Sequence, residues 1–448
     1  MLNYRSKMVE PIRLLPRNER KDRIADAGYN VFNLASEDVF IDLLTDSGTG
    51  TMSDEQWAAL MRGDEAYAGS KSFSRLKESI KEVMGFEKIV PTHQGRGSEN
   101  VLYGCLVEEG DYVPNNTHFD TTRAHIVNNG GEPVDCPVDE GLQIDEEKPF
   151  KGNISLEKVR DLADMAGPEN IPAIILTITS NSMAGQPVSM RNIRETRSLA
   201  DELDAVFVID TCRFAENAYF IKQRESGYED KTVAEIALEM LDHADAIVMS
   251  GKKDGLVNVG GFVGVRDDDL FERTKQRGIL YEGFTTYGGM AGRDLDAMAV
   301  GLREAVEHSY ISSRVEQVKE LGEMLLERDV PIYRPTGGHA VYVDAGNLLP
   351  HIPSQEFPGQ ALVCQMYIEG GVRGVELGSF AFPGSHDRPE FVRLALPRRM
   401  YHKEHLEHIA ETLGNIRDSR DELSGMRIVD EPDFEELRHF SAELEPIK

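Results

Sequence analysis

Ala244-Asp-Ala-Ile-Val-Met-Ser-Gly-Lys-Lys-Asp-Gly-Leu-Val-Asn-Val-Gly-Gly261 is the stretch around which the chain is organised. Its apolar run 246–249 predicts a short buried strand that stops at Ser250, and Lys252 and Lys253 follow at once. A lysine amine held in a partly dry pocket has a lowered pKa, which favours Schiff-base chemistry. A pair of surface lysines after a strand is the plainer alternative, and this stretch alone favours it.

A second apolar run lies upstream and also ends in charged side chains. It reads Ala205-Val-Phe-Val-Ile-Asp-Thr-Cys-Arg213, so a predicted strand ends in Asp210 and Arg213 comes three residues later. A strand that ends in aspartate, followed by a strand that ends in Ser-Gly-Lys, is typical of enzymes that use pyridoxal phosphate. Asp210 would keep the pyridine nitrogen protonated, and a lysine would bind the aldehyde.

Longer blocks of the chain resemble the pyridoxal-phosphate β-eliminating lyases nearly from end to end. The matching blocks are residues 36–49, Gly63-Asp-Glu-Ala-Tyr-Ala-Gly-Ser70, Pro91-Thr-His-Gln-Gly-Arg-Gly97, Thr177-Ile-Thr-Ser-Asn-Ser182, residues 213–222, the two lysines and Val392-Arg-Leu394. In this family the second lysine of the pair carries the cofactor, so the resemblance implies Lys253. It also implies the aspartate-aminotransferase-like fold of type I pyridoxal-phosphate enzymes, and a homotetramer.

A phosphate site is predicted where a strand gives way to a helix at residues 92–99. The glycines of this loop let the backbone approach an anion, and the N–H groups at a helix N-terminus point towards it. A plain strand-to-helix turn would have the same composition and is commoner. The resemblance makes Gly95, Arg96 and Ser250 the phosphate contacts.

The resemblance assigns further side chains to the cofactor ring and to the substrate. Phe119 would stack on the pyridine ring, and Asn181 and Arg213 would reach its phenolic oxygen. Arg393 lies within an apolar strand, and a buried cation needs an anion, either in a structural salt bridge or in the carboxylate of a substrate. The resemblance favours the substrate, with Thr45, Ser47 and Asn181 completing its site.

A monovalent cation and a proton donor are implied by the resemblance alone. The family holds the cation between the carboxylate at Glu65 and the backbone carbonyls at Gly48 and Asn258, and oxygen ligands suit a hard ion such as potassium. Tyr67, two residues after Glu65, is the family's candidate for proton transfer near the leaving group.

Three positions separate the two branches of this family, which release indole from L-tryptophan or phenol from L-tyrosine. Asp120 follows the stacking Phe, where the phenol branch has Thr, and His439 stands where that branch has Phe. Leu377 occupies the position of the arginine that recognises the phenolic oxygen. All three favour L-tryptophan, which would be converted to indole, pyruvate and ammonia, with Lys253, Tyr67, Asp120 and His439 as catalytic residues.

Two other functions would fit the same sequence features. Release of phenol from L-tyrosine would use the same cofactor site. A non-catalytic pyridoxal-binding or scaffolding protein would keep the fold without the reaction, but the intact set of Lys253, Asp210, Arg213 and Arg393 argues against it.

The amino-acid composition limits the classes of partner that the chain can bind. The 448 residues carry 78 acidic and 49 basic side chains, a net charge of −29, which argues against nucleic acid or an anionic membrane as a partner. No apolar run approaches a membrane span and no signal peptide is evident, so we expect a cytoplasmic enzyme. Acidic residues are scattered, as in residues 139–147, which favours a halophilic source over an ordinary acidic protein.

Apolar strands alternate with amphipathic helices from residue 88 to residue 249, which predicts an α/β fold with a mainly parallel sheet covered on both faces. We expect a large cofactor-binding domain at 51–305 and a smaller α/β domain at 306–448. Residues 1–50 would pack with the smaller domain, as in the family that the chain resembles.

Overall fold

A computed structural model describes residues 4–5, 7–384, 388–433 and 437–447. The chain forms two compact units, one of Ser47–Val315 and one that combines Met1–Asp46 with Glu316–Lys448. The division falls within helix α12 (His308–Leu326). No helix in the described ranges combines the length and the apolarity that crossing a bilayer requires.

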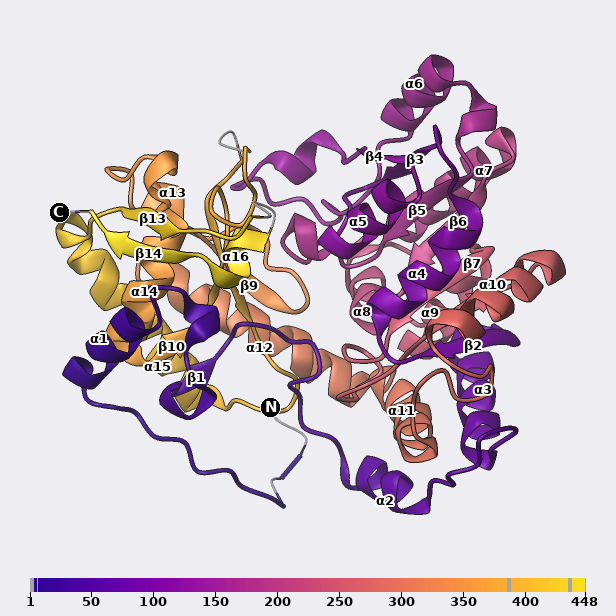
Figure 1. The fold of residues 1–448 in the computed structure, drawn as a ribbon, viewed down its shortest axis with the longest axis horizontal. Coiled ribbons are helices and arrows are strands. Elements are labelled where there is room, and N and C mark those ends of the chain that lie inside the picture. Colours follow the sequence, from indigo (N-terminus) through magenta and orange to yellow (C-terminus); the bar gives the residue numbers. More distant parts are fainter. Residues whose placement is uncertain (1–3, 6, 385–387, 434–436, 448) are drawn as a thin grey trace. The chain divides into compact units, whose positions relative to one another are not determined.

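The larger unit is built on a seven-stranded sheet in the order β2-β8-β7-β6-β5-β3-β4. Its strands are β2 (Lys88–Thr92), β3 (Tyr112–Asn115), β4 (Glu132–Asp135), β5 (Ala173–Thr177), β6 (Val206–Asp210), β7 (Ala246–Ser250) and β8 (Gly261–Val265). Figure 1 labels these strands except β8. The five strands from β7 to β4 are parallel, which confirms the prediction of a mainly parallel sheet. Sequence analysis did not identify β8, which is antiparallel to both β7 and β2. Residues 251–260 join β7 to β8 without a helix, and so short a connection can only return antiparallel.

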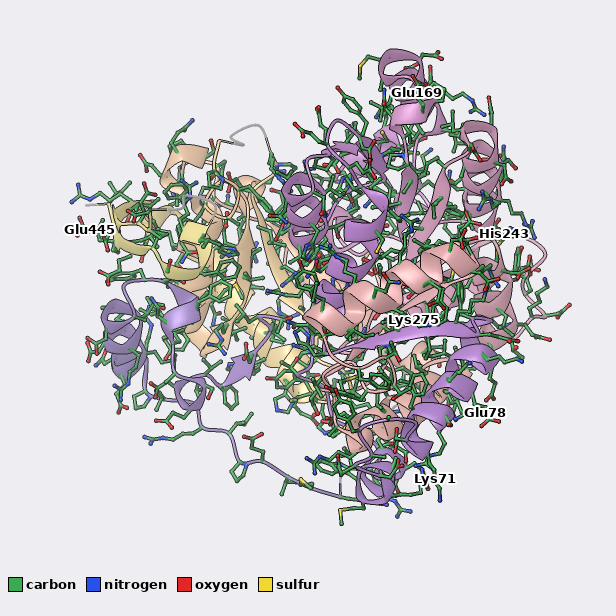
Figure 2. All side chains as sticks on the ribbon, turned by 45° about the vertical axis from the view of Figure 1, so that its right-hand side comes forward. Lys71, Glu78, Glu169, His243, Lys275 and Glu445 are labelled. Atoms are coloured by element: carbon green, nitrogen blue, oxygen red, sulfur yellow. The ribbon has the colours of Figure 1, made fainter. Side chains whose placement is uncertain are left out.

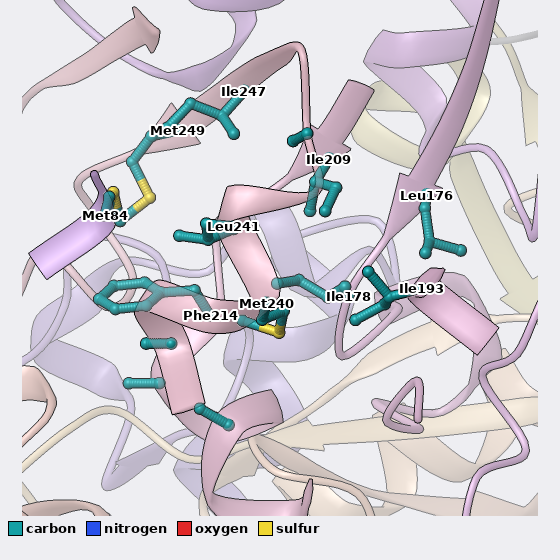
Figure 3. Close-up of a cluster of buried hydrophobic side chains, with 14 of the residues drawn as sticks. Met84, Leu176, Ile178, Ile193, Ile209, Phe214, Met240, Leu241, Ile247 and Met249 are labelled. Carbon is teal, nitrogen blue, oxygen red and sulfur yellow. The ribbon is translucent and has the colours of Figure 1, made fainter. Parts of the chain in front are cut away.

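Helices cover both faces of this sheet because alternate strand residues point to opposite sides. Ile175, Val208 and Val248 pack with α4 (Gly95–Leu106), α5 (Asp120–Asn128) and α10 (Asp268–Tyr281). On the other face, strand residues such as Ile209 and Met249 meet side chains of neighbouring helices, as Figure 3 shows. Those helices are α3 (Lys71–Met84), α6 (Leu156–Ala166), α7 (Met190–Leu203), α8 (Phe214–Arg224), α9 (Val233–Asp242) and α11 (Gly292–Ala305). The sheet is therefore buried on both faces, and polar side chains gather where its strands end.

A capping residue fixes the start of α2 (Asp54–Arg62), a helix that precedes this sheet in the sequence. Ser53 caps α2: its hydroxyl accepts the N–H of Gln56 at 3.0 Å, and the Gln56 side chain accepts the N–H of Ser53 at 3.0 Å. This reciprocal pair satisfies two of the open donors at the helix start. The helix therefore begins at Asp54.

The described residues of the smaller unit form three small sheets. Strands β11 (Val375–Leu377), β12 (Phe391–Ala395) and β9 (Ala340–Asp344) form an antiparallel sheet in that order. The other two sheets pair β1 (Ile41–Asp42) with β10 (Val372–Arg373), and β13 (Met426–Asp430) with β14 (Glu443–Pro446). In the apolar segment 39–44 only Ile41–Asp42 is paired, so β1 is short. Helices α1 (Arg17–Asp26), α13 (Ala345–Leu348), α14 (Pro358–Gly370), α15 (Lys403–Asp418) and α16 (Arg438–Ser441) complete the unit, and α1 packs on α14.

Acidic side chains project into solvent from the larger unit. Glu78 on α3 and Glu169 in the turn before β5 are both exposed, as Figure 2 shows. With 78 acidic and 49 basic residues in the chain, solvent and counterions have to screen an excess of carboxylates.

Candidate active site

The centre of the site lies at the carboxyl ends of β6 and β7. These strands are parallel neighbours, with Asp210 opposite Val248, so Asp210 and Ser250 end at the same edge of the sheet. Asp210 is buried, and its Oδ1 accepts the N–H of Cys212 at 3.0 Å. Cys212 Sγ in turn accepts the N–H of Ser250 at 3.3 Å. A chain of hydrogen bonds thus links the two strand ends.

The two lysines follow β7 in a loop whose base is closed. Gly251 N–H donates to Gly260 O at 2.8 Å, and Lys253 N–H donates to Ser250 O at 3.3 Å. The Lys253 ammonium lies close enough to the buried thiol of Cys212 and to the carboxyl of Glu99 to lower the pKa of each, against the larger effect of burial. The predicted cofactor lysine therefore lies beside buried acidic groups.

Lys252 has different surroundings. Its carbonyl accepts the N–H of Gly48 at 2.8 Å, and a Cβ on Gly48 would lie 2.6 Å from its Cε. Burial lowers the pKa of Lys252, and the charges of Lys253 and Arg96 lower it further. The neighbouring lysines thus contact different segments of the chain.

The start of α4 forms a possible anion cradle beside Ser250. Gln94, the residue before the helix, makes no side-chain cap, so the first N–H groups of α4 are available to a ligand. A Cβ on Gly95 would lie 2.7 Å from Ser250 Cβ, which explains the glycine. Ser98 Oγ donates to Met249 O at 3.1 Å and fixes the helix to the end of β7. Arg96 is exposed at the same turn.

The loops that follow β3, β5 and β6 carry the residues expected around a cofactor ring. Phe119 is half-buried and immediately precedes α5, whose first residue, Asp120, is exposed. Asn181 and Arg213 are both buried in the loops after β5 and β6. Thr179 Oγ1 donates to Arg213 O at 2.9 Å, which holds these two loops together.

Arg393 and His439 lie near each other in the smaller unit. Burial lowers the pKa of His439 to about 3, and the charge of Arg393 contributes to this shift, so the imidazole is neutral at physiological pH. Its Nε2 is buried and has no hydrogen-bond partner among the described residues. Arg393 faces Val375 across the β11–β12 pair, and Leu377 faces Phe391, so Leu377 and Arg393 lie on the same side of the sheet.

The segment before residue 47 is fixed to the same unit. Arg393 Nη2 donates to Leu44 O at 2.9 Å, which places the half-buried Thr45 next to this contact. Asp46 forms a buried ion pair with Arg398, with Nη1 2.9 Å from Oδ2. Ser47, the next residue, is half-buried and begins the larger unit.

The structure brings together two of the three predicted cation ligands. Asn258 Nδ2 donates to Gly48 O at 2.8 Å. The Glu65 side chain is 55% exposed and lies 3.6 Å from Arg293 in an ion pair. Within the described ranges no group of three or more His, Cys, Asp or Glu side chains could hold a metal ion. A cation at Gly48 and Asn258 would therefore depend on backbone carbonyls.

Tyr67 lies on an exposed aromatic cluster. Its side chain is 70% exposed, and its ring centroid lies 5.6 Å from that of Phe284 and 5.1 Å from that of Tyr287. A hydrogen bond to the Tyr287 hydroxyl raises the pKa of Tyr67. The predicted proton donor thus faces solvent in the single chain.

Sequence reasoning missed two buried acidic residues of this region. Glu99 lies on α4 and accepts hydrogen bonds from two threonine hydroxyls of α5, and Asp46 pairs with Arg398. A single charged residue in a helix or a turn gives no sign of burial in the sequence. Its neighbours on the helix, such as the buried Ser98 and Val101, were the feature that could have indicated that Glu99 faces inward.

Comparison with known proteins gives a consistent result. The model of the β-eliminating lyase family matches residues 42–412. The probable tryptophanase of Halobacterium salinarum is 60% identical over 448 residues, covering 100% of both chains. The tryptophanase of Salinibacter ruber is 50% identical and covers 99% of this chain and 95% of that one. The tyrosine phenol-lyase of Symbiobacterium thermophilum is 48% identical and covers 99% and 98%.

The chain also resembles solved structures of low sequence identity, and this resemblance concerns the fold alone. The serine palmitoyltransferase of Sphingomonas wittichii is 14% identical, with a TM-score of 0.62 over 91% of this chain and 97% of that chain. This likeness confirms the predicted fold class.

Proposed function

Because the chain belongs to the β-eliminating lyase family, we propose that it uses pyridoxal phosphate to convert L-tryptophan and water to indole, pyruvate and ammonia. One observation carries the proposal: a lysine follows the end of β7 beside the buried Asp210, at the same sheet edge as the uncapped start of α4. This arrangement provides an amine, a carboxylate and an anion cradle together.

The residues at the sheet edge fit this cofactor. Gly95 and Ser250 approach so closely that a Cβ on the glycine would clash, which leaves backbone N–H groups and the Ser250 hydroxyl for a phosphate. Asp210, buried at the end of β6, would keep a pyridine nitrogen protonated. When bound, pyridoxal phosphate supplies an electron sink that allows the bonds at the α- and β-carbons to break.

The chain's own groups then hold the substrate and move protons. Arg393 would bind the substrate carboxylate through its guanidinium. The Lys253 Nζ, once free, would take the proton from the α-carbon. Thr45, Ser47 and Asn181 would orient the amino acid, and Arg213 would stabilise negative charge on the cofactor's phenolic oxygen.

Release of indole needs a proton on the ring carbon that leaves. We assign this proton transfer to Tyr67, with Asp120 as its helper. The neutral His439 offers a buried Nε2 that can accept the indole N–H, because its pKa of about 3 keeps it unprotonated. His439 would therefore act by recognition rather than as an acid.

The alternative substrate is L-tyrosine, and Leu377 argues against it. Leu377 and Arg393 share a face of the β11–β12 pair, so an apolar wall lies near the expected carboxylate site. A phenol hydroxyl against that wall would be buried without a partner, at a cost of roughly 1–3 kcal/mol. This favours tryptophan by about ten- to a hundredfold.

Potassium, a homotetramer, cytoplasmic location and a halophilic source complete the proposal. A Cβ on Gly48 would lie 3.0 Å from the backbone carbonyl oxygen of Asn258, and this closeness of the two segments supports a carbonyl-built cation site there, to which Glu65 would add its carboxylate. The excess of 78 acidic over 49 basic residues supports a requirement for salt, because screening lowers the repulsion between surface carboxylates. Activity that persists in full after dilution into low salt would contradict the halophilic source.

Two measurements on the purified protein test the main proposal. The bound cofactor should give a visible absorption band that shifts when L-tryptophan is added. Indole release from L-tryptophan should exceed phenol release from L-tyrosine by at least about tenfold. Equal or greater phenol release would assign the chain to the other branch, and no visible band would contradict the use of the cofactor.

A further inference from the structure

Glu99 connects the two helices that begin at the proposed cofactor site. It lies in the second turn of α4, the helix that starts at Gly95. Its carboxylate accepts a hydrogen bond from Thr121 Oγ1 at 2.5 Å and a second from Thr122 Oγ1. Both threonines lie in the first turn of α5, two and three residues after Phe119. The Glu99 carboxylate therefore links the start of α4, where we propose that the phosphate binds, to the start of α5, which follows the proposed stacking residue Phe119.

The surroundings of Glu99 are those of a buried functional group rather than a surface ion pair. The groups that face it are Tyr103 on its own helix, the two threonines on α5, Asp210 at the end of β6, and Lys253. Burial raises the pKa of Glu99 to about 7, and the charge of Asp210 adds to this effect, while the threonines and Lys253 oppose it. The nearby charge of Asp210 thus adds to burial in favouring the protonated form of the Glu99 carboxyl.

We propose that Glu99 is a positioning residue for the cofactor, which fixes the start of α5, and with it Phe119, relative to the phosphate loop and Asp210. The inference rests on the proposed use of pyridoxal phosphate. Hydrogen bonds to a buried carboxyl are strong because water does not compete for them. Without Glu99, the first turns of α4 and α5 lose this shared anchor, and the ring-binding surface loosens.

The effect should appear in cofactor binding without any substrate. Apoprotein is titrated with pyridoxal phosphate, and the dissociation constant and the pH midpoint of the visible absorption are measured for the wild type and for Glu99→Gln. A double variant, Thr121→Val with Thr122→Val, removes the same hydrogen bonds from the other side. Glu109→Gln, an exposed glutamate just after α4, is the matched control. Thermal unfolding of each apoprotein is recorded in parallel.

We expect Glu99→Gln and the threonine pair each to raise the dissociation constant about tenfold, which matches the net contribution of one to two hydrogen bonds. A variant that combines Glu99→Gln with the two threonine substitutions should have about the same dissociation constant as either one alone, because both changes break the same contact. Glu99→Gln should also move the pH midpoint, and Glu109→Gln should change neither quantity. Glu99→Asp should recover part of the affinity.

Three outcomes would overturn the inference or its premise. A dissociation constant and pH midpoint unchanged in Glu99→Gln would show that Glu99 does not position the cofactor. A fall in unfolding temperature with both binding quantities unchanged would reduce Glu99 to a structural role. Wild-type apoprotein that binds no pyridoxal phosphate would refute the proposed function itself, and the inference with it.

Discussion

Two regions of the larger unit, the sheet edge and the segment 63–70, carry the predicted chemistry in opposite ways. At the sheet edge, Asp210 and Ser250 are buried and linked through Cys212. In the segment 63–70, the side chains of Glu65 and Tyr67 are 55% and 70% exposed. The residues proposed to bind the cofactor at the sheet edge are therefore buried within one chain, while those proposed for the leaving group and the cation face solvent. The proposed homotetramer would supply the surface that this segment lacks.

The largest effect should come from the sheet edge. Lys253→Ala removes both the amine that binds the cofactor and the base for the α-proton, so turnover should fall by about 10⁴-fold or more. Steady-state indole release measures the loss. Borohydride reduction followed by peptide mapping should label Lys253, and a label on Lys252 would exchange the roles of the two lysines.

Tyr67 tests whether the exposed segment takes part in chemistry at all. Tyr67→Phe should lower kcat for tryptophan by about a hundredfold, because the proton for the leaving indole is lost, and should leave cofactor affinity unchanged. Tyr281→Phe, at another exposed tyrosine, is the control. If kcat stays at the wild-type value, the proton comes from elsewhere and the division of the site into two halves fails.

A smaller effect is expected for His439, which we propose to recognise the indole leaving group. His439→Phe removes the acceptor for the indole N–H and should lower kcat/KM for tryptophan by about tenfold, while the slow reaction with tyrosine changes little. Because His439 is neutral, its pKa of about 3 predicts no change in this contribution between pH 6 and 9. A titration of kcat/KM near neutral pH that disappears in His439→Phe would contradict the neutral imidazole.

A smaller effect, of about severalfold, is expected at the cation site. Potassium should activate the enzyme more than sodium at matched ionic strength, and Glu65→Ala should remove the difference. Asp54→Ala, on an exposed acidic residue of α2, controls for loss of charge alone. Equal activity in both salts would separate Glu65 from cation binding.

The smallest effect concerns stability and again compares the buried region with the surface. The pKa of Glu99 is raised to about 7 in the folded chain, from an ordinary value of 4.5. Its contribution to stability is therefore full below about pH 4.5 and is lost as pH rises towards 7. Glu99→Gln should reduce the fall in the apoprotein's Tm across this window by a few degrees. Glu109→Gln should leave it unchanged, and an identical fall in all three proteins would show that Glu99 does not titrate there.

The sequence predicted the parts of the site that depend on local pattern. Asp210 and the pair Lys252–Lys253 were predicted at strand ends because an apolar run that ends in a charged residue indicates a strand end, and parallel strands end at one edge. The choice of Lys253 over Lys252 came from the family resemblance. The antiparallel β8 was missed because its glycines interrupt the apolar pattern of Gly261-Phe-Val-Gly-Val265. Local sequence patterns could not predict which residues far apart in the chain lie close together in the fold. Nothing in the sequence near His439 signals its contact with Arg393, and Glu99 reads as an ordinary helical glutamate.

The position of β2 at the edge of the sheet has a consequence for how the chain folds. This strand leads into the proposed phosphate-binding loop, and among the described residues its only strand partner is β8, from Thr92 opposite Gly261 to Lys88 opposite Val265. A contact between segments roughly 170 residues apart forms slowly, because the long intervening chain has to be ordered before the strands can meet. During synthesis the phosphate loop leaves the ribosome well before its partner does, so cofactor binding has to wait until the chain is made at least through β8. The cofactor can then capture a finished sheet but cannot guide its early assembly.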